Sequence, residues 1–216
     1  MTLKADLYFS YRSPYSYFGA GLYRRIAAEW DVEISLKVVY PIAIRDPEFF
    51  ERENPQWLTY LVRDVMRTGQ YLKMPIAMPQ PDPIKMDLAT REIAADQPLI
   101  RPISYLGVEA ERRGRGLAFA AEISAMIWGG VKGWNEDETL AAAATRAGLD
   151  LGEMNAAIEG REEGFEAEIL ANQDALEKAG HWGVPTLVFE NEPFFGQDRV
   201  DMALWRMKAA GLTARS

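Results

Sequence analysis

Two short stretches near the N-terminus have the alternation of apolar and polar residues that is typical of strands. Alternation over residues 7–11 predicts a first strand. A period of two over residues 32–38 predicts a second strand with one solvent-exposed face, as expected near a sheet edge. Between them, Phe18, Leu22 and Ile26 recur at helical spacing and predict a helix. Strand, helix and strand in this order form a βαβ unit, whose right-handed crossover makes the strands parallel.

Helical patterns dominate the chain from Pro41 to Gly180. Trp57, Leu61 and Val65 fit a helix that ends near Lys73, and a proline-rich connection follows, which cannot be a helix interior. Further helices are predicted at residues 86–96, 98–113, 117–128, 137–147, 151–158 and 162–179.

Residue patterns typical of strands occur again after Gly180. Residues 186–189 and 193–195 flank a short polar turn and predict a hairpin, and residues 196–199 open a final helix. The order is βαβ, helical block, ββα. We therefore expect a thioredoxin-like domain formed by residues 1–40 and 181–216, with residues 41–180 as a helical insertion domain.

Composition excludes several classes of function. The net charge is −8 without a block of basic residues, so nucleic acid and anionic membranes are poor partners. The N-terminal residues lack the apolar segment of a signal peptide, and no apolar run is long enough to span a membrane, so we expect a cytoplasmic protein. There is no cysteine and one histidine, His181, which excludes protein-thiol chemistry and a histidine metal cluster.

The joint between the first strand and the first helix is the strongest candidate for chemistry. Ser13 is suited to cap the helix and Pro14 to fill its first position. Unpaired N–H groups and the positive end of the helix dipole would then stabilise an anion above the joint. Taken alone, however, Ser13 is better explained as a cap with no further role.

Three motifs together resemble a known family. They are Tyr8-Phe9-Ser10-Tyr11-Arg12-Ser13-Pro14-Tyr15-Ser16-Tyr17, Gly183-Val184-Pro185-Thr186 and Phe195-Gly196-Gln197-Asp198-Arg199. The chain resembles the 2-hydroxychromene-2-carboxylate isomerase family, which is related to kappa-class glutathione transferases and has a DsbA-like thioredoxin fold with a helical insertion. Ser13 stands where redox members of this fold have a cysteine, and Pro185 stands at the place of the cis-proline.

The resemblance implies glutathione as the cofactor, with no metal. Ser13 would be the catalytic residue, hydrogen-bonding the sulfur while the helix N-terminus lowers the thiol pKa from about 8.5. Val184 and Pro185 would hold the tripeptide backbone, and Gln197 and Asp198 its γ-glutamyl end. The implied reaction is thiol-assisted cis–trans isomerisation of a small aromatic carboxylate.

The substrate side is matched less closely by the family. Tyr15, Asn54 and Trp57 are the candidates for binding the substrate. Arg12, with the tyrosine before it, replaces the more apolar pair usual in the family, and Gln197 replaces a smaller residue. The resemblance to this family also suggests that the chain forms a homodimer.

Two other functions stay open. A kappa-like glutathione transferase would conjugate the thiol rather than return it. A redox-inactive DsbA-like module would bind an extended peptide at the proline loop and would tolerate Ser13→Ala. A low-molecular-weight thiol other than glutathione also fits the residues.

Overall fold

A computed structural model describes residues 2–87 and 92–215. Its strands form one mixed sheet in the order β2-β1-β3-β4. The strands are β1 (Leu3–Phe9), β2 (Val32–Val38), β3 (Thr186–Phe189) and β4 (Glu192–Phe195). The four predicted strands are thus confirmed, although β1 begins and ends earlier than the alternation over residues 7–11 suggested.

The sheet brings the two ends of the chain together. β1 pairs in parallel with β2, from Leu3 opposite Val32 to Phe9 opposite Val38, which confirms the βαβ unit. β3 runs antiparallel to β1, and β4 continues as its hairpin partner. β2 forms one edge, so its alternate residues remain at least partly exposed.

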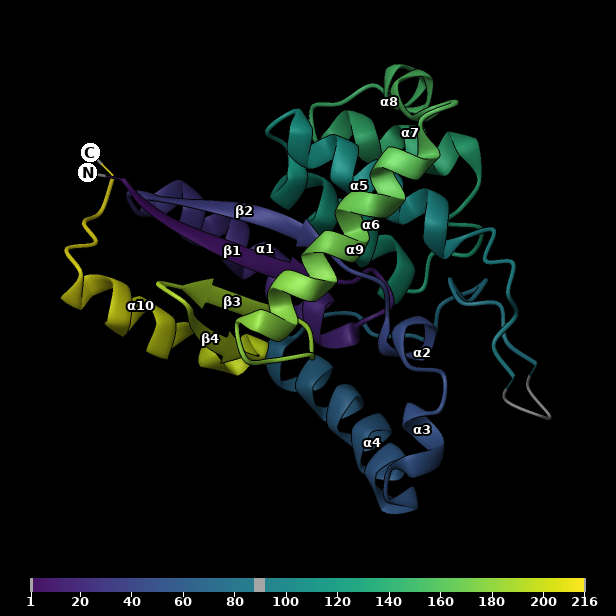
Figure 1. The fold of residues 1–216 in the computed structure, drawn as a ribbon, viewed down its shortest axis with the longest axis horizontal. Coiled ribbons are helices and arrows are strands. Elements are labelled where there is room, and N and C mark those ends of the chain that lie inside the picture. The colour runs from purple at the N-terminus through teal and green to yellow at the C-terminus, as the bar shows by residue number, and fades with distance from the viewer. Residues whose placement is uncertain (1, 88–91, 216) are drawn as a thin grey trace.

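Helices fill the chain between and after the strands. They are α1 (Pro14–Glu29), α2 (Ile42–Arg45), α3 (Phe49–Arg52), α4 (Pro55–Leu72), α5 (Ile100–Arg112), α6 (Gly116–Trp128), α7 (Asp137–Arg146), α8 (Leu151–Ile158), α9 (Glu162–Lys178), the 3-10 turn η1 (Gln197–Arg199) and α10 (Val200–Ala209). Figure 1 shows α2 to α9 gathered at one end of the sheet and beyond it, and the chain ends together at the other.

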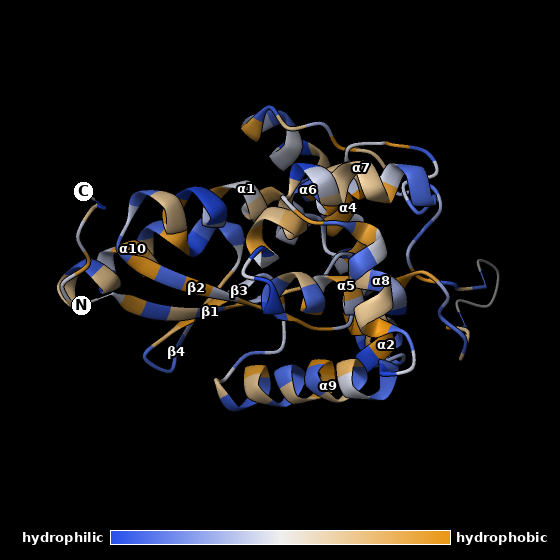
Figure 2. Cartoon of the chain, turned by 90° about the horizontal axis from the view of Figure 1, so that it is seen from above, coloured by the Kyte–Doolittle hydropathy of each residue, from blue (hydrophilic) through white to orange (hydrophobic). Residues whose placement is uncertain are grey.

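Hydrophobic packing divides the molecule into layers. Leu7 and Phe9 of β1 face a large core that includes α1, α5, α6 and α10. Tyr8, on the opposite face of the same strand, packs with Val39 and with Leu176 of α9. Figure 2 shows α9 on the side of the sheet away from α1. Because successive strand residues point to opposite faces, β1 is covered on both sides.

One helix expectation is wrong in the described residues. At 86–96, Met86 and Ile93 form an isolated antiparallel bridge, and residues 88–91 lie outside the described part. The buried amide of Gln97 explains the extended backbone: it accepts from Lys85 N–H at 2.9 Å and donates to the carbonyls of Lys85 and Ala94 at 3.0 and 2.7 Å. These side-chain bonds replace the backbone bonds of a helix.

In residues 2–87 and 92–215, no helix is both long enough and apolar enough to cross a membrane. In the same ranges, no three acidic or histidine side chains are grouped so that they could hold a metal ion.

Candidate functional site

Ser13 caps α1 and reaches a second segment of the chain. Its hydroxyl accepts a hydrogen bond from Ser16 N–H at 3.2 Å and donates one to the Val184 carbonyl at 3.2 Å. Pro14 occupies the first turn, where its missing N–H costs no helical hydrogen bond. The half-buried hydroxyl therefore lies between the positive end of a helix and the loop before β3.

The loop before β3 is held in a turned conformation. The Val184–Pro185 peptide bond is cis. The Pro185 carbonyl accepts from Gly196 N–H at 2.8 Å, and the Thr186 hydroxyl donates to the Gly183 carbonyl at 2.7 Å. The loop is thereby tied both to β3 and to the segment that opens the last helix.

Val184 offers one backbone group that a ligand can use. In the described part of the chain its N–H has no hydrogen-bond partner, and the residue is only half-buried. A backbone N–H without a partner, beside a carbonyl that can accept a second hydrogen bond, can pair with an extended peptide, as at a sheet edge. The backbone of a tripeptide such as glutathione fits this pattern.

Gln197 and Asp198 lie in η1, next to α1. An added Cβ at Gly19 of α1 would stand 3.4 Å from the Gln197 Cβ, so the two elements touch. Gln197 is half-buried, whereas Asp198 is exposed and pairs with Arg199 at 2.9 Å. The structure thus brings Ser13, Val184, Pro185 and Gln197 into one region, with Asp198 at its surface.

Tyr15 points to α4. Its hydroxyl donates a hydrogen bond of 2.5 Å to Asp64, which also accepts from Arg67. Partial burial opposes ionisation of Asp64, but the hydrogen bonds from Tyr15 and Arg67 outweigh it and hold the carboxyl pKa below its ordinary value. Tyr15 is therefore engaged in joining α1 to α4.

Asn54 and Trp57 lie at the start of α4. The exposed Asn54 caps the helix by accepting from Gln56 N–H at 2.9 Å. Trp57 is half-buried and packs edge-to-face on Phe49, with ring centroids 5.7 Å apart. Phe49 in turn lies 5.0 Å from the Trp182 ring, so it connects Trp57 to the proline loop.

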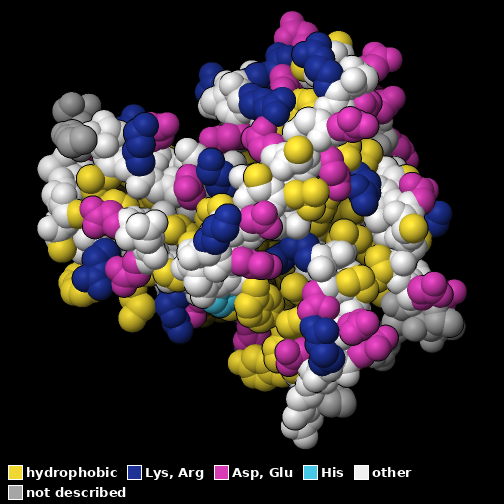
Figure 3. Space-filling view, viewed as in Figure 1, with side chains coloured by type: hydrophobic (Ala, Val, Ile, Leu, Met, Phe, Trp, Pro, Cys, Tyr) yellow, Lys and Arg dark blue, Asp and Glu magenta, His cyan; other side chains and the backbone are white. Residues whose placement is uncertain are grey.

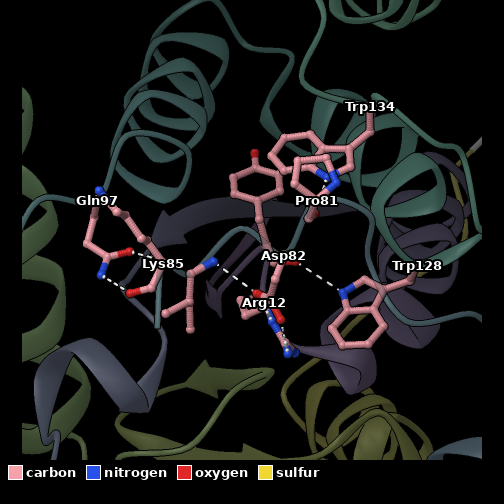
Figure 4. Close-up of polar contacts among 9 residues, drawn as sticks. Arg12, Pro81, Asp82, Lys85, Gln97, Trp128 and Trp134 are labelled. Atoms are coloured by element: carbon pink, nitrogen blue, oxygen red, sulfur yellow. Dashed lines mark hydrogen bonds and ion pairs between the residues drawn. The ribbon is translucent and has the colours of Figure 1, made fainter. Parts of the chain in front are cut away.

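A segment that we call the strap, residues 75–84, is fixed to the β1–α1 joint. Arg12 donates to both carboxylate oxygens of Asp82, at 2.6 and 2.7 Å, and its guanidinium lies 5.0 Å from the Trp128 ring (Figure 4). Tyr17 donates to the Pro75 carbonyl at 2.7 Å. Asp82 was missed by sequence reasoning; its signals were the unusual Arg12 before Ser13 and the run of prolines.

An aromatic cluster, consisting of Phe49, Trp57, His181, Trp182 and Phe195, borders the proline loop. His181 stacks on Phe195 at 4.1 Å, and its Nδ1 accepts from Gly183 N–H at 2.8 Å. Trp182 and Phe195 are each 44% exposed. Figure 3 shows the histidine, in cyan, next to hydrophobic side chains on this face. These rings were not among the expected site residues, except for Trp57.

The geometry favours chemistry on a ligand's sulfur or oxyanion. A hydroxyl donor and a helix N-terminus both stabilise negative charge, and both are at Ser13. The chain contributes no thiol of its own because it has no cysteine. A thiol that reacts here must therefore come with a ligand.

Nearly the whole chain matches one family of known proteins. The sequence profile of the DSBA-like thioredoxin domain matches residues 4–208. No curated protein matches the chain by sequence. Solved structures, in contrast, resemble nearly the full chain.

Three of these structures illustrate the similarity. One of 2-hydroxychromene-2-carboxylate isomerase has a TM-score of 0.71 and 17% identity, covering 96% of each chain. Cytosolic disulfide reductase DsbM from Pseudomonas aeruginosa has a TM-score of 0.61 and 16% identity, covering 96% of this chain and 100% of that one. DsbM with GSH has a TM-score of 0.58 and 17% identity, covering 95% and 100%. At such identities the likeness establishes the fold.

Proposed function

The chain belongs to the DSBA-like thioredoxin domain family, and from this premise we propose that it is a glutathione-dependent cis–trans isomerase of a small aromatic carboxylate. The observation that carries the proposal is the Ser13 hydroxyl, held 3.2 Å from the Val184 carbonyl at the start of α1. A DsbA-like protein without cysteine has no thiol of its own at this position.

The residues of the chain would bind and orient the thiol. Val184 would pair with the tripeptide backbone through its N–H and carbonyl, and Gln197 with Asp198 would hold the γ-glutamyl end. The Ser13 hydroxyl would turn its hydrogen from Val184 to the sulfur, and the helix dipole would lower the thiol pKa. When bound, glutathione supplies a nucleophile that adds reversibly to a conjugated double bond, so that the bond can rotate before the thiol leaves.

Two relatives support this proposal. The isomerase structure has the same fold over the whole chain, and DsbM has been solved with GSH. The cytosolic description of DsbM agrees with our proposal that this chain acts in the cytoplasm. We also propose that it forms a homodimer, which light scattering during gel filtration would test.

The decisive experiment is calorimetry of glutathione with the wild type and with Ser13→Ala, followed by an absorbance assay on 2-hydroxychromene-2-carboxylate. We expect glutathione to bind the wild type, and Ser13→Ala to reduce turnover about 100-fold, the size of a lost oxyanion donor. Ser13→Thr keeps the hydroxyl and the cap and should retain most activity. Equal turnover by Ser13→Ala and the wild type would contradict the proposal.

The same samples separate the other two functions. A transferase would consume glutathione with chlorodinitrobenzene, whereas an isomerase returns it. A peptide-binding module would bind an extended peptide equally well with and without Ser13. Reduction of insulin without added thiol is expected to be absent, because the chain has no cysteine.

A further inference from the structure

Arg45, the last residue of α2, is held by carbonyl groups alone. Its Nε donates to the Tyr40 carbonyl and its Nη2 to the Trp182 carbonyl, both at 2.8 Å. In the described part of the chain Arg45 forms no ion pair, although the carboxylates of Glu177 and Asp46 act on its charge from beyond ion-pair distance. Carbonyl groups orient a guanidinium without neutralising it, so the charge of Arg45 is only partly balanced.

Other arginines around the site are neutralised. Arg12 pairs with Asp82 at 2.6 Å, and Arg199 pairs with Asp198 at 2.9 Å. Arg52 pairs with Asp46, the carboxylate that follows Arg45 in the sequence. Among the described residues, Arg45 is thus an arginine at this edge of the site that forms no ion pair, so its charge can interact with a ligand.

The position of Arg45 relates it directly to Ser13. Arg45 contacts the Trp182 carbonyl, and Ser13 contacts the Val184 carbonyl, two residues further along the same loop. Two residues of extended chain span at most about 7 Å. A ligand that lies along this loop with its reacting end at Ser13 would therefore bring its other end toward Arg45.

The guanidinium group of Arg45 is suited to bind a carboxylate. A guanidinium has five N–H groups, and the hydrogen bonds to Tyr40 and Trp182 leave Nη1 without a partner among the described residues. Burial lowers the pKa of Arg45 more than the carboxylates of Glu177 and Asp46 raise it, so the charge is partly desolvated and gains from a further anionic partner. A protein with a net charge of −8 repels anions at long range, so a carboxylate needs a local cation to bind.

We propose that Arg45 binds the carboxylate of a ligand that lies along residues 182–184, with the exposed Trp182 ring beside it. The proposal rests on the proposed function for the identity of that ligand. The carboxylate belongs either to the glycine end of glutathione or to the aromatic substrate. Both sources present the same group, and they can be separated by esterification.

The test compares each acid with its ester by calorimetry. The two pairs are glutathione with its glycyl monoethyl ester, and 2-hydroxycinnamate with its methyl ester. We expect the wild type to bind one of the acids 10- to 100-fold more tightly than its ester, the range of one charge-assisted hydrogen-bonded contact. In Arg45→Gln this ratio should fall to about one, and Arg45→Lys should restore part of it.

Arg63→Gln is the matched control, since it removes the same charge from an exposed position on α4. It should leave the ratio of acid to ester unchanged, and circular dichroism of each variant would verify folding. If Arg45 only positions the loop, Arg45→Gln weakens acid and ester equally, which overturns the proposal. Equal binding of acid and ester by the wild type in both pairs also overturns it.

The failure of the proposed function is distinguishable from that of this inference. If glutathione and its ester both fail to bind the wild type, the glutathione-dependent function fails. The hydroxycinnamate pair then still tests Arg45 by itself.

Discussion

Ser13 and Val184 are joined by a hydrogen bond of 3.2 Å across 171 positions of sequence. The bond connects the first turn of α1 to the cis-proline loop, so that a helix N-terminus and an unpaired backbone N–H meet at one place. Either segment alone has an ordinary structural explanation. Their contact makes the site.

The first prediction concerns the electrostatics of this place. A Ser13→Cys variant should have a thiol pKa well below the ordinary value of about 8.5, because the helix N-terminus favours the thiolate. The pKa is measured by thiolate absorbance at 240 nm during a pH titration. Thr59→Cys, on the exposed second turn of α4, serves as control and should titrate normally. Equal pKa values in the two variants would show that the start of α1 exerts no such effect.

The second prediction concerns the strap. Arg12→Gln and Asp82→Asn should each destabilise the fold, and the double variant should lose less than the sum of the two. We expect a coupling of about 1 kcal/mol, because the pair is bidentate but Asp82 is partly exposed. Urea unfolding of the four proteins measures it. Additive effects would mean that this pair does not hold the strap to the joint.

The third prediction concerns His181. Burial lowers its pKa below the ordinary 6.5, and Nδ1 must be unprotonated to accept the hydrogen bond from Gly183 N–H. Since the folded pKa is lower than the unfolded one, the neutral ring contributes stability that is fully present above pH 6.5 and is lost as the pH falls through the folded pKa. The chain has one histidine, so NMR titration needs no assignment. A pKa at or above 6.5 would be contrary to this.

The fourth prediction concerns Asp64. Its folded pKa is below the ordinary 3.8, despite an opposing effect of burial, because Tyr15 and Arg67 donate hydrogen bonds to it. Its contribution to stability is therefore present above about pH 4 and is lost as the pH falls through the folded pKa. Tyr15→Phe should raise the Asp64 pKa and reduce the acid-dependent loss of stability. Thermal unfolding between pH 2 and about 6 measures this; an unchanged pH profile in Tyr15→Phe would refute the coupling.

Elements with strong local signals were predicted well. α9 was predicted at 162–179 and spans Glu162–Lys178, and β3 was predicted at 186–189 and spans Thr186–Phe189. Hydrophobic spacing decides such elements because one face must be buried. The short α2 and α3 were missed, since one turn has no periodicity to detect. The helix expected at 86–96 was wrong where the chain is described. The Gln97 side chain forms hydrogen bonds with the backbone N–H and carbonyl of Lys85, which lies far from it in sequence for a helix.

By itself the sequence determined that this protein has a βαβ and ββα frame, a capped helix start at Ser13 and no thiol, because these follow from local spacing, capping chemistry and composition. Only the tertiary structure decided that Ser13 contacts Val184, that Arg12 binds Asp82, and that Arg45 donates to the Trp182 carbonyl. These relationships join residues that are far apart in the chain, and their geometry depends on how the sheet and the helices pack. Local sequence carries no record of such distances.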